Sequence, residues 1–179
     1  SDGTRLVDHL NNQDGRSNIP DFPQEGIIFR DITTLLKDKE ALQEAMSALE
    51  ETLKDVDFDY VVGPESRGFI FGVPLAVYMK KGFIPARKKG KLPAETVSKT
   101  YDLEYGTATI EIHADAIRPG DKVVLVDDLL ATGGTAKAIC ELLEEMGATV
   151  QKAVFMIELE GLNGRAQLGK IPVSSVIKY

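Results

Sequence analysis

The sequence predicts a single α/β domain in which a mainly parallel central sheet is flanked by helices. Short β-rich runs alternate with helical segments along the chain, and this alternation builds a sheet with helices on both faces. Residues 122–126, KVVLV, are almost entirely aliphatic, which is typical of a strand inside a parallel sheet. The 179 residues suffice for one domain, residues 1–179, with a sizeable core.

A helix is predicted over residues 38–54. Four apolar residues recur there at spacings of four, three and four, which places them in one stripe on a helix surface. The stripe consists of Leu42, Met46, Leu49 and Leu53. Asp38 is a suitable N-cap, because its carboxylate can accept from the first free N–H groups of the helix.

The other elements follow from local composition. A buried helix with a kink near Pro74 is predicted over residues 69–79, and another helix over 136–146, where Gly147 suits a left-handed stop. The predicted strands are residues 60–63, 83–87, 107–112, 122–126, 150–159 and 173–178. Residues 88–106 form a long polar connection with little apolar periodicity, and structureless stretches of this length often act as lids.

Composition excludes several classes of function. The formal net charge of −7 argues against a nucleic-acid partner, and no apolar run approaches the roughly 20 residues that cross a bilayer. The opening residues lack the n-region and h-region of a secretory signal. Cys140, the single cysteine, cannot form an internal disulfide, and its apolar helical surroundings predict a buried, inert thiol. We therefore expect a soluble, cytoplasmic protein.

The segment that follows the 122–126 strand has the composition of a phosphate site. Ligands bind beyond the carboxyl ends of strands in open α/β sheets, so Asp127 and Asp128 are expected at the rim of a cleft. The small residues after them leave backbone N–H groups accessible at the start of a helix, where an anion binds well. These residues are Ala131, Thr132, Gly133, Gly134 and Thr135. Because two carboxylates match the vicinal hydroxyls of a ribose, the segment predicts a ribose 5-phosphate cradle.

The alternative interpretation is a tight strand–helix turn whose aspartates cap the helix or face solvent. The pattern is not a Walker A loop. Its nearest imitation, GRAQLGK at residues 164–170, continues into Ile171 and Pro172 instead of a Ser or Thr and a helix, so we discard it as a phosphate-binding motif.

Residues 123–135, VVLVDDLLATGGT, resemble the motif that binds 5-phosphoribosyl 1-pyrophosphate (PRPP) in the type I phosphoribosyltransferases. A protein that uses PRPP needs a second, cationic pocket for its pyrophosphate. Two cationic segments follow predicted strands: GPESRG at 63–68, with Arg67, and ARKKGK at 86–91. The basic residues of the second segment are Arg87, Lys88, Lys89 and Lys91. A solvated basic face is an equal alternative for Lys89 and Lys91.

Further segments make the resemblance more specific. They are PDFPQEGIIFRDIT (20–33), GPESRGFIFG (63–72), RKKGKLP (87–93) and YDLEYG (101–106). Together with residues 123–135 they are similar to the adenine phosphoribosyltransferases, in the same order and spacing, from about Pro20 to about Leu159. The resemblance implies a type I phosphoribosyltransferase fold with an N-terminal hood over about residues 1–35, which recognises the base, and a flexible catalytic lid loop at residues 88–106.

The resemblance also implies roles for individual residues. Pyrophosphate would be bound by Glu65, Ser66, Arg67, Arg87, Lys88 and Lys91, with a non-proline cis peptide between the first two. Ile28 and Arg30 would read the adenine edge through the main chain while Phe29 stacks on the ring. From residue type alone, these three residues favour an ordinary core strand.

Catalytic roles follow from the same resemblance. Glu104 would be the acid/base residue for the imidazole edge of the purine, and Tyr105 would help to close the site against water. Without the resemblance, Glu95 and Asp102 are equal candidates for the acid/base role.

The expected reaction converts adenine and PRPP into AMP and pyrophosphate, as in purine salvage. Mg²⁺ is expected, held mainly through PRPP and water without a dedicated set of protein ligands. Neither His9 nor His113 has metal-ligand spacing to another histidine, so a zinc site is not predicted. The resemblance implies a homodimer. The alternatives are transfer to another base, such as a 6-oxopurine or orotate, and a non-catalytic regulator that senses PRPP with the same fold.

Overall fold

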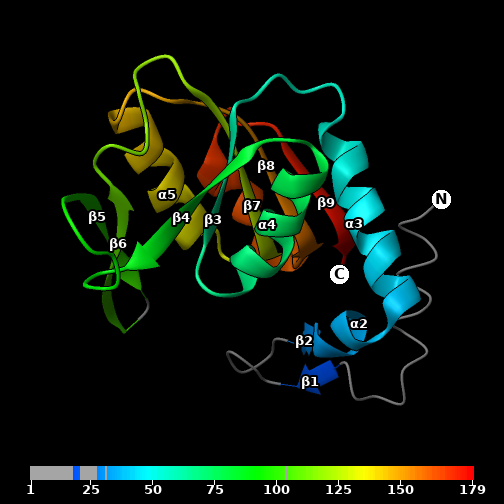
Figure 1. Cartoon of the computed structure of the whole chain (residues 1–179). Helices are drawn as coiled ribbons and strands as arrows, with labels where there is room; N and C mark the ends of the chain where they lie inside the picture. The colour runs from blue at the N-terminus through cyan, green and yellow to red at the C-terminus, as the bar shows by residue number, and fades with distance from the viewer. Residues whose placement is uncertain (1–17, 21–27, 31, 104) are drawn as a thin grey trace.

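The computed structural model describes residues 18–20, 28–30, 32–103 and 105–179 (Figure 1). In this part of the chain a two-stranded antiparallel ribbon pairs β1 (Asn18–Pro20) with β2 (Ile28–Arg30). Two helices follow, α2 (Thr33–Lys37) and α3 (Lys39–Leu53). The expected hood of about residues 1–35 includes this ribbon, and the rest of residues 1–31 lies outside the described residues.

Seven strands of the described chain form the main sheet, in the order β5-β6-β4-β3-β7-β8-β9. Their bounds are β3 (Tyr60–Pro64), β4 (Gly82–Lys88), β5 (Thr96–Leu103), β6 (Gly106–His113), β7 (Lys122–Leu130), β8 (Thr149–Glu158) and β9 (Val173–Lys178). The five strands from β4 to β9 in this order pair in parallel, while β6 and β5 add an antiparallel edge. The predicted mainly parallel α/β sheet is therefore confirmed.

Helices cover both faces of this sheet, so its central strands are buried on both sides. Val124 and Val126 of β7 pack in one cluster with α3 and α4 (Arg67–Tyr78), whereas Val123 and Leu125 pack in a second cluster with α5 (Gly134–Glu145). Burial on both sides explains why residues 122–126 lack the alternation of a half-exposed strand.

The predicted helix over 38–54 is confirmed as α3. Its N-cap is Asp38, whose Oδ1 accepts from the N–H groups of Glu40 and Ala41, each at 3.0 Å. Three of the four residues of the predicted stripe are buried and Leu42 is partly buried. Cys140 is buried in α5 as predicted, and burial raises the pKa of its thiol to about 12. None of the helices in the described part of the chain has the length and apolar character required to span a membrane.

The prediction of a structureless connection over residues 88–106 was wrong for residues 96–103. Residues 96–103 form β5, which pairs antiparallel with β6 from Thr96↔His113 to Leu103↔Gly106. Lys99 contacts Glu141 and Glu145 of α5 and so docks the hairpin on that helix. A strand at the edge of a sheet takes its hydrogen bonds from one neighbour and has little apolar contact to make, so its sequence carried no period-two signal.

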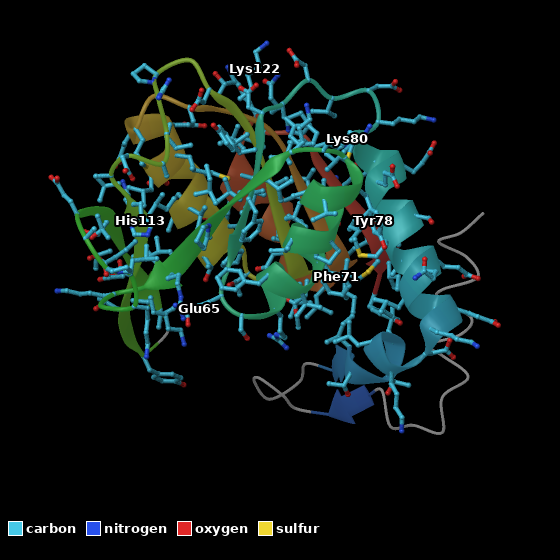
Figure 2. The ribbon with its side chains drawn as sticks, in the orientation of Figure 1. Glu65, Phe71, Tyr78, Lys80, His113 and Lys122 are labelled. Carbon is cyan, nitrogen blue, oxygen red and sulfur yellow. The ribbon has the colours of Figure 1, made fainter. Side chains whose placement is uncertain are left out.

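The β7 strand is also longer than predicted, because it continues through the two aspartates to Leu130. Its pairing with β3 stops at Leu125, whereas its pairing with β8 continues as far as Leu130↔Glu158. Asp127 and Asp128 therefore belong to a strand, but beyond Leu125 that strand pairs with β8 and no longer with β3. Figure 2 shows Glu65 next to this end of the sheet and Lys122, the first residue of β7, at the opposite end.

Candidate functional site

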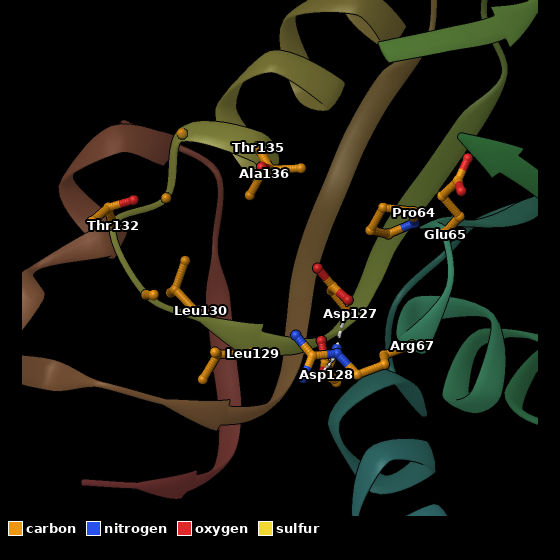
Figure 3. Close-up of a pocket in the computed structure, with 13 residues that line it drawn as sticks. Pro64, Glu65, Arg67, Asp127, Asp128, Leu129, Leu130, Thr132, Thr135 and Ala136 are labelled. Carbon is orange, nitrogen blue, oxygen red and sulfur yellow. Dashed lines mark hydrogen bonds and ion pairs between the residues drawn. The ribbon is translucent and has the colours of Figure 1, made fainter. Parts of the chain in front are cut away.

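The site lies where the chain reverses direction across the sheet. From β3 the chain passes through α4 to β4 on one side, and from β7 it passes through α5 to β8 on the other side. Because β3 and β7 are neighbours, their carboxyl ends face a crevice between two diverging connections, which is where open α/β sheets bind ligands. A pocket of about 230 Å³ lies there, lined by Pro64, Glu65, Arg67 and residues 127–136 (Figure 3).

The turn between β7 and α5 presents free backbone donors to this pocket. Gly133 has a φ of 89°, in the left-handed region, and α5 starts at the next residue without a side-chain cap. In the described part of the chain, the N–H groups of residues 131–135 donate to no protein acceptor. At Gly134 an added Cβ would meet nothing within 4 Å, so the space in front of these amides is open. The predicted cradle, from Ala131 to Thr135, therefore has the geometry of an anion site at a helix N-terminus.

The two aspartates occupy the other side of the pocket. Asp128 is only 5% exposed, and its Oδ2 lies 2.9 Å from Nε of Arg67, the first residue of α4. The N–H of Asp128 donates to Oδ1 of Asp127 at 2.7 Å. Surrounding atoms crowd the Asp127 carboxyl, and this burial, together with the neighbouring charge of Asp128, raises the pKa of Asp127 well above its usual range.

The loop after β3 brings Glu65 and Ser66 to the same edge. The peptide bond between them is cis, as the resemblance implied. Glu65 Oε1 accepts from the N–H of Lys88 at 2.7 Å and from Nε of Arg87 at 3.2 Å. These contacts lower the pKa of Glu65, and the hydrogen bond from the N–H of Lys88 has the largest effect. Ser66 is exposed and immediately precedes α4.

Glycine is required where this loop crosses the aspartates. A Cβ added to Gly68 would lie 2.7 Å from Cδ of Pro64 and 3.2 Å from Oδ1 of Asp127. Any larger residue would therefore separate α4 from β7 and widen the pocket.

The cationic residues after β4 are only partly brought to the site. Arg87 faces Glu65, and Lys88 and Lys89 line a second pocket of about 420 Å³ that shares Pro64, Glu65 and Thr135 with the surroundings of the first. Lys91 lies in the exposed turn beyond β4, where its N–H donates to the Lys88 carbonyl at 3.2 Å, and it lines neither pocket.

The predicted base-binding and acid/base residues have different outcomes. Ile28, Phe29 and Arg30 form β2, of which only the backbone is described. Glu104 lies outside the described residues. Tyr105, at the tip of the hairpin, is 91% exposed and lines neither the pocket of the cradle nor the second pocket beside Lys88 and Lys89.

Two features of the site were missed at the level of sequence. The hydroxyl of Tyr101 on β5 lies 3.1 Å from Oγ1 of Thr135, which links the edge hairpin to the cradle. In addition, η2 (Gly164–Leu168) packs beneath the cradle turn, and Gly133 approaches it so closely that an added Cβ would lie 2.6 Å from the Gly164 carbonyl oxygen. The sequence signal for the second feature is the GRAQLGK segment at residues 164–170, which is not a phosphate-binding motif.

Comparison with known proteins identifies the family. Residues 31–171 match the model of the phosphoribosyl transferase domain. The adenine phosphoribosyltransferase of Lachnoclostridium phytofermentans is 60% identical over 162 residues, which cover 90% of this chain and 93% of that protein. The adenine phosphoribosyltransferase of Kosmotoga olearia is 53% identical over 170 residues, 95% of this chain and 100% of that protein. The chain belongs to the adenine phosphoribosyltransferase family.

Solved structures of the family share this fold. The adenine phosphoribosyltransferase of Thermoanaerobacter pseudethanolicus has a TM-score of 0.87 and 50% identity, covering 90% of this chain and 94% of that one. The Saccharomyces cerevisiae family member, solved with D-2,5-dideoxy-2,5-imino-altritol 1,6-bisphosphate and adenine, has a TM-score of 0.85 and 40% identity, covering 97% and 99%. The predicted family and its type I phosphoribosyltransferase fold are therefore confirmed.

Proposed function

We propose that this chain transfers the 5-phosphoribosyl group of PRPP to adenine, with release of pyrophosphate and formation of AMP, in purine salvage. The observation that carries the proposal is the pocket between β3 and β7. It combines free backbone donors at residues 131–135 with two adjacent carboxylates and one guanidinium, from Asp127, Asp128 and Arg67. A sugar phosphate that carries a second anionic group has matching chemistry.

Each group of the pocket has a role in this proposal. The amides of the cradle bind the 5-phosphate, and the Thr135 hydroxyl adds a donor. The carboxylates of Asp127 and Asp128 accept hydrogen bonds from the ribose hydroxyls. Arg67 lies on the pyrophosphate side of Asp128, and Arg87 and Lys88 extend that positive side along the end of β4. Lys91 would reach pyrophosphate only through movement of its turn.

Bond exchange takes place at the anomeric carbon. Its bond to the pyrophosphate oxygen breaks, a bond to N9 of adenine forms, and the N9 proton leaves to a base, for which we propose Glu104. Positive charge develops on the ribose while negative charge grows on the departing pyrophosphate. The carboxylate of Asp128 stabilises the positive charge on the ribose, and the cations stabilise the negative charge on pyrophosphate. Tyr105, now exposed, would cover the site when the hairpin closes.

We further propose that adenine binds beside β2, with Ile28 and Arg30 reading its edge through the main chain and Phe29 stacking on its face. The antiparallel pairing of β2 with β1 supports this role, because a short ribbon has unpaired backbone groups on its outer side. Transfer to a 6-oxopurine or orotate would require a different set of donors and acceptors at this ribbon.

Mg²⁺ is proposed as the cofactor. The acceptors in the pocket, Glu65, Asp127 and Asp128, supply oxygen ligands of the kind that Mg²⁺ prefers. Among the described residues no group of three or more His, Cys, Asp or Glu side chains is arranged to hold a metal ion. We therefore assign most of the ligands to PRPP oxygens and water. When bound, Mg²⁺ would neutralise charge on the leaving pyrophosphate.

A homodimer in the cytoplasm is also proposed. Along α4, Ile70, Val73 and Val77 recur at helical spacing and are exposed, Val77 by 66%. An exposed apolar stripe of this kind fits an isologous contact with a second copy of the chain. The same helix begins at Arg67, so such a contact would lie beside the pocket.

Two measurements in series test the proposed reaction. Calorimetric titration should detect binding of PRPP in the presence of Mg²⁺, and adding adenine should then release pyrophosphate. Transfer to hypoxanthine or orotate but not to adenine would overturn the choice of base. Binding of PRPP without pyrophosphate release from any base would instead favour a non-catalytic sensor.

A further inference from the structure

The turn that forms the cradle is supported from below by η2. Gly164, the first residue of η2, lies so close to the turn that an added Cβ would collide with the Ala131 carbonyl oxygen and come within 2.9 Å of Leu130 Cδ1. Gly133 faces the same helix, with the Gly164 carbonyl 2.6 Å and Gln167 Cβ 3.0 Å from where its Cβ would lie. The backbone of the cradle is therefore in direct contact with η2 at two of its residues.

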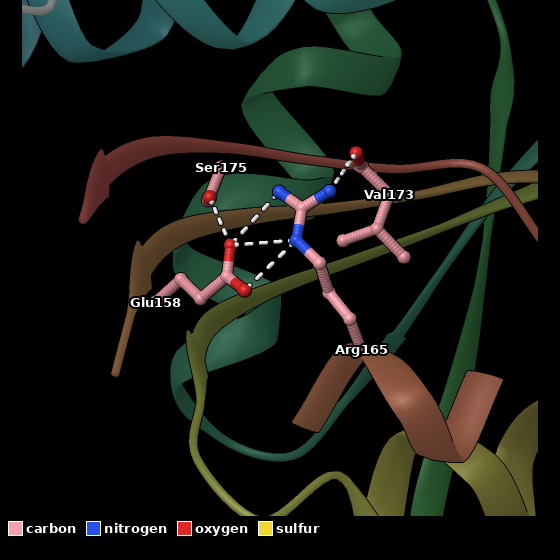
Figure 4. A network of polar contacts seen from close by, with 4 residues as sticks. All are labelled: Glu158, Arg165, Val173 and Ser175. Atoms are coloured by element: carbon pink, nitrogen blue, oxygen red, sulfur yellow. Dashed lines mark hydrogen bonds and ion pairs between the residues drawn. The ribbon is translucent and has the colours of Figure 1, made fainter. Parts of the chain in front are cut away.

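Arg165 of η2 makes polar contacts with the sheet (Figure 4). Arg165 makes a two-pronged contact with Glu158, the last residue of β8: Nε lies 2.9 Å from Oε2 and Nη2 lies 2.9 Å from Oε1. Its Nη1 donates to the Val173 carbonyl at 3.0 Å, and Ser175 Oγ donates to Glu158 Oε1 at 2.5 Å. The network therefore joins η2 to the ends of β8 and β9.

This network is largely buried at Glu158 and lies next to the cradle in the register of the sheet. Glu158 is only 3% exposed and pairs with Leu130, the residue that immediately precedes the cradle turn. The hydrogen bonds from Arg165 lower the pKa of Glu158, so its carboxylate stays charged and accepts both hydrogen bonds from the guanidinium. Planar, two-pronged pairs fix orientation as well as distance, which a lysine cannot do.

We propose that Arg165 and Glu158 are positioning residues for the phosphate cradle, acting through the contact of Gly164 with Ala131. In this role they hold the backbone of residues 131–135 in the conformation in which its amides can bind a phosphate monoester together. The inference rests on the proposed function, because the monoester is the 5-phosphate of the ribose. It gives the discarded GRAQLGK segment a function in phosphate binding without making it a phosphate-binding loop itself.

The first test replaces Gly164 with alanine and uses Gly161→Ala as the matched control. A Cβ at Gly161 meets nothing within 4 Å, so the control adds the same methyl group without a collision. Calorimetry with ribose 5-phosphate as the probe should show a loss of affinity of roughly tenfold or more for Gly164→Ala, because a small displacement of the amides is enough. The control should stay within about twofold of the unchanged protein.

The second test keeps the inference falsifiable if Gly164→Ala does not fold. Arg165→Lys retains the charge but loses the planar fork, and we expect a severalfold weaker affinity for ribose 5-phosphate with a far-UV spectrum like that of the unchanged protein. KM for PRPP should rise while KM for adenine stays constant. A purely structural role would raise both by the same factor, and that result, or unchanged affinity in both variants, would overturn the inference.

The same experiment separates two kinds of failure. If the unchanged protein binds ribose 5-phosphate and the folded variants bind it equally well, only the role of Arg165 and Glu158 is wrong. If the unchanged protein binds no ribose 5-phosphate and releases no pyrophosphate, the proposed function fails and the inference fails with it.

Discussion

Arg67 Nε lies 2.9 Å from Asp128 Oδ2, and this ion pair connects the first residue of α4 with the C-terminal part of β7. Asp128 is nearly buried whereas Arg67 is half exposed, so the carboxylate is held in the pocket and the guanidinium can turn toward a ligand. An anionic ligand that draws Arg67 away would leave Asp128 to accept hydrogen bonds from the ligand's hydroxyl groups. The pair thus connects the ribose side of the proposed site with its pyrophosphate side.

The first prediction concerns Asp128→Asn. The amide keeps the shape of the side chain but loses the charge that orders Arg67 and one strong acceptor for a ribose hydroxyl. KM for PRPP should rise by roughly tenfold or more, while KM for adenine changes little. Asp115→Asn, in an exposed turn after β6, is the matched control and should leave both constants unchanged. Equal KM values for PRPP in the two variants would contradict the assigned role.

A second prediction uses the raised pKa of Asp127. The folded chain holds this proton more tightly than the unfolded chain, so between the two pKa values stability falls as the pH rises. Asp127→Asn removes that dependence. Its Tm should exceed that of the unchanged protein at about pH 8, and the difference should narrow toward about pH 4, where the unfolded group also becomes protonated.

Asp57, whose pKa is lowered in the folded chain, should change stability with pH in the opposite direction and serves as the control for this measurement. Its hydrogen bond with Lys122 lowers its pKa, so its contribution is present above the unfolded pKa and is lost as the pH falls through the folded one. Asp57→Asn should therefore lower Tm slightly at neutral pH, with a deficit that disappears in acid. Scanning fluorimetry of both variants across pH provides the test, and a pH-independent difference for Asp127→Asn would contradict the prediction.

A third prediction concerns Glu104, whose role comes from the family resemblance. Glu104→Gln should reduce kcat far more than it changes the affinity for PRPP, because the amide cannot take the N9 proton. Glu95→Gln and Asp102→Asn remove the two competing acids of the same region and should retain most of the turnover. Near-normal kcat in Glu104→Gln, with a large loss in either control, would reassign the base.

A fourth prediction tests the link between the edge hairpin and the cradle. Tyr101→Phe removes the hydroxyl that lies 3.1 Å from Thr135 Oγ1. KM for PRPP should rise roughly two- to tenfold, the range expected for one hydrogen bond that orients a ligand-binding hydroxyl. Tyr78→Phe, at an exposed position on α4, removes a hydroxyl away from the cradle and should have no effect. Similar KM values for the two variants would show that Tyr101 does not orient Thr135.

A fifth prediction tests the proposed dimer. Val77→Glu places a charge in the exposed stripe of α4 and should shift the protein from dimer to monomer in light-scattering measurements after gel filtration. Lys54→Glu places a negative charge at an exposed position at the end of α3, outside the stripe, and should leave the mass unchanged. If Val77→Glu remains dimeric, the contact lies elsewhere on the molecule.

Elements with a clear hydrophobic pattern in their own residues could be predicted from the sequence. The helix from residue 38 and the strand at 173–178 were predicted almost to the residue. The residues of each element carry the apolar pattern of a helix or a strand. The β5 strand was missed because its stability comes from pairing with β6 and from docking of Lys99 on α5. Such contacts depend on the tertiary fold and leave no mark in the composition of residues 96–103.

The site shows the same division. The cradle could be predicted from Gly133 and Gly134, because a strand–helix turn with exposed amides needs several consecutive small residues. The support from η2 could not, because it depends on the absence of a side chain at Gly164 and on a pair between residues of different elements, Arg165 and Glu158. The partner of Asp128 was equally hidden, since Arg67 reaches it only through the pairing of β3 with β7.

The most direct test of the phosphate cradle follows backbone amide resonances by nuclear magnetic resonance during titration with ribose 5-phosphate. The amides of residues 131–135 should move most, while those of the basic turn at residues 88–91 move little because the probe lacks pyrophosphate. Titration with ribose, which lacks the phosphate, should leave the resonances of these amides unchanged. Shifts concentrated at residues 88–91, with none at 131–135, would contradict the assignment of the cradle.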